Sequence, residues 1–339
     1  MWNVAARPLA LRIVCALLAC MKLLLLLLLG CFSLSPLSAE PLEKIFMQLD
    51  WKPNAQFAGL LVASEKGYYQ EAGLAVKILP VDSEMDTVGR VVLGDQWIGC
   101  AESHVLLAAK AKDAPIKAFG TMIQQSPFAL FSLKKSGITT VKEMKGRVVG
   151  LHADGDKAID VVLGTNGLQR SDVIIKKIGY GLDPLLNGEC EIMQGYLVDE
   201  VVACEQRGIE INIIPMSDHG YTAYGQVYFC NEKFLAAKPD LVRRFLQASN
   251  RGWAEAVRDP QGTAKMIVKK YLPQEDIAYQ EASLRRLIPA LTAEDSRLGW
   301  MKAATWEEAS QMFGKYRIVD RYVSPGELVT YEVLQALEK

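Results

Sequence analysis

Apolar and polar residues alternate with two different periods along most of this chain of 339 residues. Short apolar runs rich in β-prone residues are followed by longer segments in which apolar residues recur every three or four positions. The first pattern is typical of strands and the second of helices, so their succession predicts βαβ units with parallel strands and right-handed crossovers. In the first part of the chain the predicted strands are 45–50, 74–81, 97–101 and 116–122, and the predicted helices are 55–66, 85–93 and 105–111.

The pattern restarts near residue 128 and ends in a long helical region. The second series of predicted strands is 128–133, 147–151, 173–178, 191–194, 209–214 and 224–229, with helices at 157–163 and 199–205 and a helical turn around Leu185. After residue 235 the predicted elements are helices, at 241–257, 262–271, 275–287, 305–313 and 327–338. This order predicts an α/β protein with two three-layer lobes and a helical C-terminal tail.

The chain is expected to run from one lobe to the other and back. In this interpretation residues 40–125 and 222–339 form lobe one, and residues 126–221 form lobe two. Two hinge strands then connect the lobes, one near Gln125 and one near Gly220. A mature chain of about 300 residues is long enough for two lobes with hydrophobic cores of their own.

Residues 1–39 predict a secretory signal peptide that is removed from the mature chain. Arg7, Arg12 and Lys22 are positive, no acidic residue occurs before Glu40, and a leucine run follows at 23–29. A positive segment before a short apolar segment is typical of such signals, and this run is too short to span a bilayer. No later segment of the sequence is apolar enough for a transmembrane helix.

Two processing sites compete in this segment. Cleavage after Ala39 yields a secreted chain, whereas Leu28-Leu29-Gly30-Cys31 resembles a bacterial lipobox that would leave Cys31 lipid-modified. Leucine just before Gly30 is less usual in a lipobox, which favours simple secretion. Met21 is an alternative start of translation.

Composition excludes several classes of function. The formal net charge is −1 and becomes more negative once the signal peptide is removed, and no basic stripe predicts a nucleic-acid partner. No dinucleotide, P-loop or nucleophile-elbow motif occurs. The cysteines after the predicted signal peptide and the three histidines show no metal-ligand spacing, so we expect no metal site and mostly buried cysteines. These residues are Cys100, Cys190, Cys204, Cys230, His104, His152 and His219.

Polar and aromatic residues follow the first predicted strand where a helix is expected to begin. Asp50 and Trp51 close this strand, Pro53 disfavours helix before it, and Asn54 is suited to cap the helix. Small ligands bind at the carboxyl ends of strands in open α/β folds. The indole offers a π-face, and the two polar side chains offer hydrogen bonds. All three are candidate ligand-binding residues, against the alternatives of a core tryptophan and a simple helix cap.

Two further polar segments are candidates in lobe one. Glu102 and Ser103 follow the strand 97–101 and precede a helix, where Ser103 is either a ligand contact or an N-cap. Gln124 and Gln125 lie at the first hinge. Their amides either bond the edge of a heterocycle or satisfy backbone groups in the crossover.

The remaining candidates lie in or beside lobe two. Tyr196 follows the strand 191–194 and is expected to stack opposite Trp51, with a surface or core tyrosine as the alternative. Glu200 either reaches a ligand amine or is an ordinary acid in the first turn of a helix. Tyr224 flanks the second hinge and is also a candidate ligand-binding residue.

Several short motifs fit together as a set. They are Leu49-Asp50-Trp51-Lys52-Pro53-Asn54, Lys66-Gly67-Tyr68-Tyr69, Glu71-Ala72-Gly73-Leu74, Gly99-Cys100-Ala101-Glu102-Ser103, Gly146-Arg147-Val148-Val149-Gly150, Met193-Gln194-Gly195-Tyr196, Tyr224-Gly225-Gln226-Val227 and Gly299-Trp300-Met301. This set resembles the thiamine-pyrimidine (no-message-in-thiamine-like) family of ABC-transporter periplasmic solute-binding proteins, over essentially all of residues 44–338. The family also contains a fungal single-turnover pyrimidine synthase, and related receptors serve riboflavin, nitrate, sulfonates and taurine.

The resemblance implies a bilobal periplasmic-binding-protein fold of type II with a ligand in the interlobe cleft. It also implies a periplasmic location, a membrane permease of an ABC importer as partner, a monomeric state and no cofactor. In the fungal synthase a lysine can hold pyridoxal phosphate, and the aligned position here is Ala101. The histidine one helical turn later is replaced by Val105, and residues 220–223 stand where the synthase has adjacent cysteines. Without an amine no Schiff base can form, so we expect no enzyme.

The prediction is therefore a substrate-binding component of an ABC importer. It would clamp a small, flat, neutral or cationic heteroaromatic such as a thiamine pyrimidine precursor by stacking and a few hydrogen bonds. One alternative is the same receptor fold for riboflavin, nitrate, a sulfonate or taurine. Others are an enzyme of pyrimidine synthesis and a sensory ligand-binding module.

Overall fold

The computed structural model describes residues 41–81, 85–152, 155–179 and 181–338. The predicted signal peptide 1–39 and Cys31 lie outside these residues and stay predictions. Residues Leu42–Lys339 form one unit by their internal contacts. Within the described residues, no helix is both long and apolar enough to cross a membrane.

Two separate five-stranded sheets organise the chain. The first has the order β2-β1-β3-β10-β4 and the second the order β7-β6-β8-β5-β9. The strands of the first sheet are β1 (Glu43–Gln48), β2 (Leu74–Leu79), β3 (Trp97–Ala101), β4 (Ile116–Ile123) and β10 (Gly225–Asn231). The strands of the second are β5 (Phe128–Leu133), β6 (Val148–Leu151), β7 (Ile174–Lys177), β8 (Ile192–Tyr196) and β9 (Ile211–Pro215).

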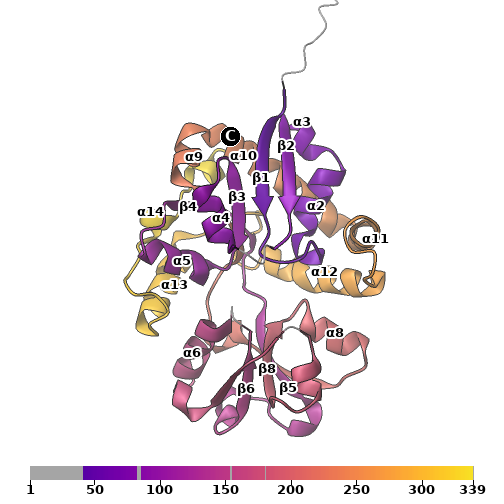
Figure 1. Cartoon of the computed structure of the whole chain (residues 1–339), viewed down its shortest axis with the longest axis vertical. Coiled ribbons are helices and arrows are strands. Elements are labelled where there is room, and N and C mark those ends of the chain that lie inside the picture. The colour runs from indigo at the N-terminus through magenta and orange to yellow at the C-terminus, as the bar shows by residue number, and fades with distance from the viewer. Residues whose placement is uncertain (1–40, 82–84, 153–154, 180, 339) are drawn as a thin grey trace, which may run out of the picture. The chain divides into compact units, whose positions relative to one another are not determined.

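The first sheet takes its strands from residues 43–123 and 225–231 and the second from residues 128–215, and the division into lobes stays a prediction. The expectation of parallel pairing is only partly right. β1 is parallel to β2 and β3, and Figure 1 shows β1 and β2 as neighbouring arrows that point the same way. β10 is antiparallel to β3 and β4, and β5 is antiparallel to β8 and β9. These antiparallel strands follow the two crossings between the sheets, where the chain direction reverses.

Helices occupy the segments between and after the strands. They are α2 (Ala58–Glu65), α3 (Tyr68–Glu71), α4 (Thr87–Leu93), α5 (Ser103–Ala111), α6 (Gly155–Thr165), α7 (Asp183–Leu186), α8 (Glu200–Gln206), α9 (Glu232–Ala237), α10 (Pro239–Arg258), α11 (Pro260–Lys270), α12 (Ile277–Leu291), α13 (Ala303–Lys315), α14 (Pro325–Leu328) and α15 (Glu332–Gln335). Short 3-10 helices are η1 (Ala55–Phe57), η2 (Lys134–Ser136), η3 (Val141–Met144), η4 (Arg170–Asp172) and η5 (Met216–His219). In Figure 1, α5, α13 and α14 lie close together beside β4.

The predicted helix 327–338 is wrong. Two short helices, α14 and α15, replace it, because Val329 between them forms a bridge with Ala118 in β4. Thr330 N also donates to Ala118 O at 2.9 Å. These extended residues cannot be helical at the same time.

The long helix α10 packs closely against the apolar helix α2. Trp253 is buried against Gly59, where a Cβ atom would lie 2.2 Å from the indole. Gly252 likewise lies so close to Gly59 O that a Cβ there would be 2.0 Å from it. Removing a buried tryptophan side chain of this kind costs about 3–5 kcal/mol of stability. This packing holds the segment between β1 and α2 in place.

Candidate functional site

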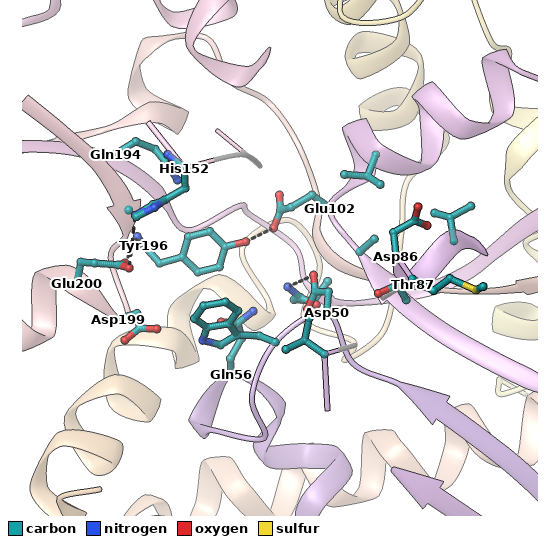
Figure 2. Close-up of a pocket in the computed structure, with 18 residues that line it drawn as sticks. Asp50, Gln56, Asp86, Thr87, Glu102, His152, Gln194, Tyr196, Asp199 and Glu200 are labelled. Carbon is teal, nitrogen blue, oxygen red and sulfur yellow. Dashed lines mark hydrogen bonds and ion pairs between the residues drawn. The ribbon is translucent and has the colours of Figure 1, made fainter. Parts of the chain in front are cut away.

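A cavity of about 430 Å³ is lined by residues from both sheets (Figure 2). A volume of this size is typical of small-molecule sites. One part of the lining comes from the first sheet and from the loops and helices that follow its strands. These residues are Asp50, Trp51, Gln56, Val81, Met85, Asp86, Thr87, Val88, Ala101, Glu102, Val105 and Gln226. The second sheet and its helices contribute His152, Gln194, Gly195, Tyr196, Asp199 and Glu200.

The segment after β1 places Asp50 and Trp51 at the cavity. Trp51 O accepts from Val81 N at 3.1 Å, and the Asn54 side chain accepts from Gln56 N at 3.0 Å, so hydrogen bonds hold both ends of the turn. Asp50 Oδ2 accepts from Gln226 Nε2 at 2.9 Å. Burial raises the pKa of the Cys100 thiol below this carboxylate, and the charge of Asp50 raises it further.

Glu102 and Tyr196 connect the two sheets across the cavity. Glu102 ends β3 at the N-cap of α5 and is only 3% exposed. Its Oε1 accepts from Tyr196 Oη at 2.9 Å, and its Oε2 accepts from Ser126 Oγ at 3.0 Å. Figure 2 shows the Tyr196 ring extending toward Glu102 along this bond. The carboxylate is therefore bonded at once to β8 and to the crossing segment.

Glu200 supports Tyr196 from the second sheet. Its carboxylate accepts from Tyr196 N at 2.8 Å, and it lies 3.9 Å from His152 Nε2. Gly195 makes this approach feasible, because a Cβ atom there would be 2.7 Å from Glu200 Oε2. His152 N in turn donates to Gln194 Oε1 at 3.1 Å. These bonds hold the tyrosine at the end of β8.

Helix α8, which follows β8 of the second sheet, contacts helix α12 of the C-terminal helical region. Tyr279 Oη donates to Asp199, and Arg286 forms an ion pair with Glu205 at 2.7 Å. Burial raises the pKa of Tyr279, and the neighbouring charge of Asp199 raises it further. Asp199 therefore borders the cavity while its carboxylate is held by α12.

The charge of the cavity lining is strongly one-sided. Five carboxylates line it, whereas the described lining residues include no Lys or Arg and only one histidine, His152. The segments 82–84 and 153–154, which the structure leaves undescribed, contain no Lys or Arg in the sequence either. Hydrogen-bond acceptors and negative charge favour a ligand that is cationic or rich in N–H donors.

The structure brings five of the ten predicted site residues together at this cavity and leaves the other five away from its lining. Asp50, Trp51, Glu102, Tyr196 and Glu200 line it, and their contact with a ligand stays a prediction.

Asn54, Ser103, Gln124, Gln125 and Tyr224 are not among the described lining residues. Asn54 caps η1, and Ser103 is the first residue of α5 rather than its cap. Gln125 is exposed, whereas Gln124 and Tyr224 bond the segment before α13. The alternative of a helix cap describes Asn54. The Gln124 amide does bond backbone groups, but these lie at residues 294–297 and not in the crossover.

Sequence reasoning missed several lining residues. Gln56 lies in η1, Gln194 within β8, and Gln226 at the start of β10. Gln226 belongs to a motif that carried the family resemblance, but nothing in its spacing marked it as a lining residue. His152 follows β6 at a strand end, the same signal that pointed to Asp50.

The cysteine and metal predictions can be compared with the described residues. Cys100, Cys190, Cys204 and Cys230 are all buried and form no disulfide, which confirms the expected burial. Burial raises the pKa of Cys190 and of Cys204 to about 11. Among the described residues, no group of three or more His, Cys, Asp or Glu side chains is arranged to hold a metal ion. The predicted lack of a metal stays a prediction.

The fold is that of a periplasmic binding protein. The periplasmic aliphatic sulphonate binding protein SsuA from Escherichia coli superposes with a TM-score of 0.68 at 13% identity, covering 83% of this chain and 95% of that one. This likeness confirms the predicted bilobal fold. The chain belongs to the NMT1/THI5 like family, whose profile matches residues 54–263. The predicted family is thereby confirmed.

Relatives of the chain include both binding proteins and synthases. The riboflavin-binding protein RibY of Chloroflexus aurantiacus is 26% identical over 290 residues, 81% of each chain. The 4-amino-5-hydroxymethyl-2-methylpyrimidine phosphate synthase of Legionella pneumophila is 25% identical over 250 residues, covering 72% of this chain and 79% of that one. The formylaminopyrimidine-binding protein of Halalkalibacterium halodurans is 22% identical over 297 residues, covering 84% and 89%.

Proposed function

We propose that this chain is the substrate-binding component of an ABC importer. It binds a small, flat, neutral or cationic heteroaromatic, such as a pyrimidine precursor of thiamine, in the cavity between its two sheets. The partners are this ligand and a membrane permease, the receptor acts as a monomer, and the location is the periplasm, with or without a lipid anchor at Cys31.

One observation carries the proposal. Trp51 from the first sheet's edge and Tyr196 from the second line a single cavity that five carboxylates also line. Two aromatic rings suit a planar guest, and each stacked pair contributes about 0.5–1.5 kcal/mol beyond the area it buries. Because the rings come from different sheets, a ligand that contacts both would hold the two lobes together.

The charge of the lining separates the candidate ligands. A sulfonate or nitrate would meet carboxylates and no Lys or Arg from the described lining residues, so an inorganic or sulfonate anion is disfavoured. An amine-bearing ring offers donors to the same groups. Riboflavin is the main alternative within this receptor fold, since RibY is a relative and the isoalloxazine is also planar.

A thermal-shift panel tests the proposal directly. The mature chain is heated with 4-amino-5-hydroxymethyl-2-methylpyrimidine, formylaminopyrimidine, riboflavin, taurine and nitrate. A ligand that binds the folded state stabilises it by RT ln(1 + [L]/Kd), so a true ligand raises Tm as its concentration rises. Stabilisation by taurine or nitrate alone would contradict the proposed ligand class. Native mass spectrometry of gently purified protein would show a co-purified ligand as added mass.

A synthase is the second candidate function, because several relatives are synthases. Against it, Ala101 lines the cavity at the position where the resemblance expects a Schiff-base lysine. An alanine side chain has no nucleophile to hold an aldehyde cofactor. Incubation with pyridoxal phosphate and a scan for imine absorbance distinguishes the two functions, and a stable adduct would favour the enzyme.

A further inference from the structure

Gln226 has a strained backbone at the edge of the cavity. Its φ is 52°, in the left-handed region that residues with a Cβ atom rarely adopt. Both neighbours are fixed, because Gly225 pairs with Ile123, Val227 pairs with Thr121, and Thr121 Oγ1 donates to Gly225 O at 2.9 Å. The side chain is 1% exposed and lines the cavity. Strain of this kind is retained where the surroundings enforce it, often at ligand sites.

The orientation of the Gln226 amide follows from its partner. Nε2 donates to Asp50 Oδ2 at 2.9 Å. A carboxylate only accepts hydrogen bonds, so the amide nitrogen must face Asp50 and the amide oxygen must point elsewhere. No described residue donates to Gln226 Oε1, although this atom is buried. A buried acceptor without a donor is destabilising, so this oxygen calls for a donor from outside the chain.

The spacing of the two acceptors suggests which donor fits. The nitrogen and oxygen of one amide are roughly 2.3 Å apart given standard C=O and C–N bond lengths, so Gln226 Oε1 lies within about 5 Å of Asp50 Oδ2. A planar primary amino group directs its two N–H bonds about 120° apart. With hydrogen bonds of about 2.9 Å, it reaches two acceptors that are up to about 5 Å apart, which covers the range allowed for this pair.

We propose that Gln226 Oε1 and the Asp50 carboxylate together bind one primary amino group on the aromatic ring of the ligand. This inference rests on the proposed function and narrows its ligand class to amino-substituted rings. An oxo group in place of the amino group would direct lone pairs at two acceptors. The pair therefore excludes oxo analogues of the same shape, a discrimination that burial makes strong.

Isothermal titration with a matched pair of probes tests this assignment. The probes are 4-amino-5-hydroxymethyl-2-methylpyrimidine and the pyrimidin-4-one in which an oxo group replaces the amino group. The wild type should prefer the amino probe by at least about thirtyfold, and Gln226→Met should lower this preference at least about tenfold. Gln247→Met, at an exposed position on α10, is the matched control and should behave as the wild type.

The outcomes separate this inference from the proposed function. If the wild type binds both probes equally, or if Gln226→Met keeps the preference, the amino-binding pair is wrong and the receptor function stands. If the wild type binds neither probe, the proposed pyrimidine ligand fails and the inference fails with it. The wild-type comparison is decisive even if Gln226→Met does not fold.

Discussion

Two regions near the predicted hinges contain the same types of residue but differ in role: one lines the cavity, and the other pairs its polar groups within the chain. The cavity region joins Asp50, Gln226, Glu102 and Tyr196, and the other region, here called the Gln124 cluster, joins Gln124, Tyr224, Glu294, Asp295 and Arg297. Each contains a glutamine, a tyrosine and acidic residues. In the cavity region Gln226 bonds Asp50 and Tyr196 bonds Glu102. In the Gln124 cluster Gln124 bonds the backbone of Glu294 and Asp295, and Tyr224 bonds the Glu294 carboxylate. Only the first region lines the cavity.

The difference lies in how completely the polar groups are paired. Gln124 Oε1 accepts from Glu294 N at 2.9 Å and from Asp295 N at 2.8 Å, and its Nε2 donates to Arg297 O at 2.9 Å. Both ends of this amide are used within the chain. Gln226 donates from its nitrogen, whereas no described residue donates to its buried oxygen.

Tyr224 shows the same complete pairing. Its hydroxyl donates to Glu294 and accepts from Lys302 N at 2.8 Å. Burial raises the pKa of Tyr224, and the bond to Glu294 raises it further, so the hydroxyl stays neutral. A fully paired polar group stabilises the fold, whereas a group with an unused atom at a cavity is available to a ligand. The comparison therefore predicts that changes in one region alter binding and changes in the other alter stability.

The largest expected effect is on binding, from Trp51→Ala. Losing a stacked, half-buried indole should weaken ligand binding by about 2–3 kcal/mol, or roughly 30- to 150-fold in Kd. Calorimetry on the ligand identified by the thermal-shift panel measures this change. Trp51→Phe keeps a ring and should lose far less, and Tm without ligand should change little in either variant. An unchanged Kd in Trp51→Ala would contradict the proposed site.

The second effect is on stability, from Gln124→Leu. This change leaves two part-buried N–H groups and one carbonyl of the 294–297 segment without their protein partner, which should cost about 1–2 kcal/mol of the free energy of unfolding. Chemical denaturation measures the loss, and Kd should stay within about twofold of the wild type. Gln125→Leu at the exposed neighbouring position is the control and should be nearly neutral. If Gln124→Leu weakened binding without loss of stability, the original prediction that Gln124 contacts the ligand would regain support.

The contrast between these two glutamines shows what the sequence could and could not predict. Gln124 directly follows β4 and Gln226 is the second residue of β10, and no local pattern distinguishes their roles. The partners of Gln124 come from 170 or more positions away, and Asp50 lies 176 positions from Gln226. A positive φ at a residue other than glycine is also invisible in the sequence. Hydrogen-bond completeness is a tertiary property, so only the folded chain reveals it.

Local signals performed well where the local chain decides the outcome. The bounds of β3 and β5 match the prediction, because each is a short, largely apolar run with aromatic residues, flanked by polar residues or proline. Asp50 and Glu102 were found because the carboxyl ends of β1 and β3 lie together at one edge of the sheet. The predicted helix 327–338 failed, because its apolar period gave no warning that Val329 would pair with β4. Local pattern predicted the elements and strand ends, and long-range pairing decided the exceptions.

A smaller effect on binding is expected from Tyr196→Phe. The ring is kept, but the hydrogen bond to Glu102 between the two sheets is lost. Because Ser126 still donates to Glu102, the loss should be about 1 kcal/mol, or roughly fivefold in Kd. Tyr322→Phe removes an exposed hydroxyl that bonds Glu307 and serves as the control. Equal Kd values for the wild type and Tyr196→Phe would show that this hydroxyl does not contribute to closure around the ligand.

The smallest effect concerns the acid stability of the Gln124 cluster. Hydrogen bonds from the Arg297 side chain lower the pKa of Asp295 from 3.8 to about 2 in the folded chain. The unfolded chain therefore takes up this proton first as the pH falls, so the stabilisation is complete above about pH 4 and is lost as the pH approaches 2. Asp295→Asn has no such proton to take up, so its free energy of unfolding should fall less steeply than that of the wild type between pH 4 and pH 2. Denaturation curves at several pH values measure both slopes.

Because Asp295 does not line the cavity, the affinity for ligand at neutral pH should be the same in the wild type and in Asp295→Asn. Parallel slopes would contradict the assigned pKa shift, and a change in affinity would show that the Gln124 cluster is not separate from the ligand site.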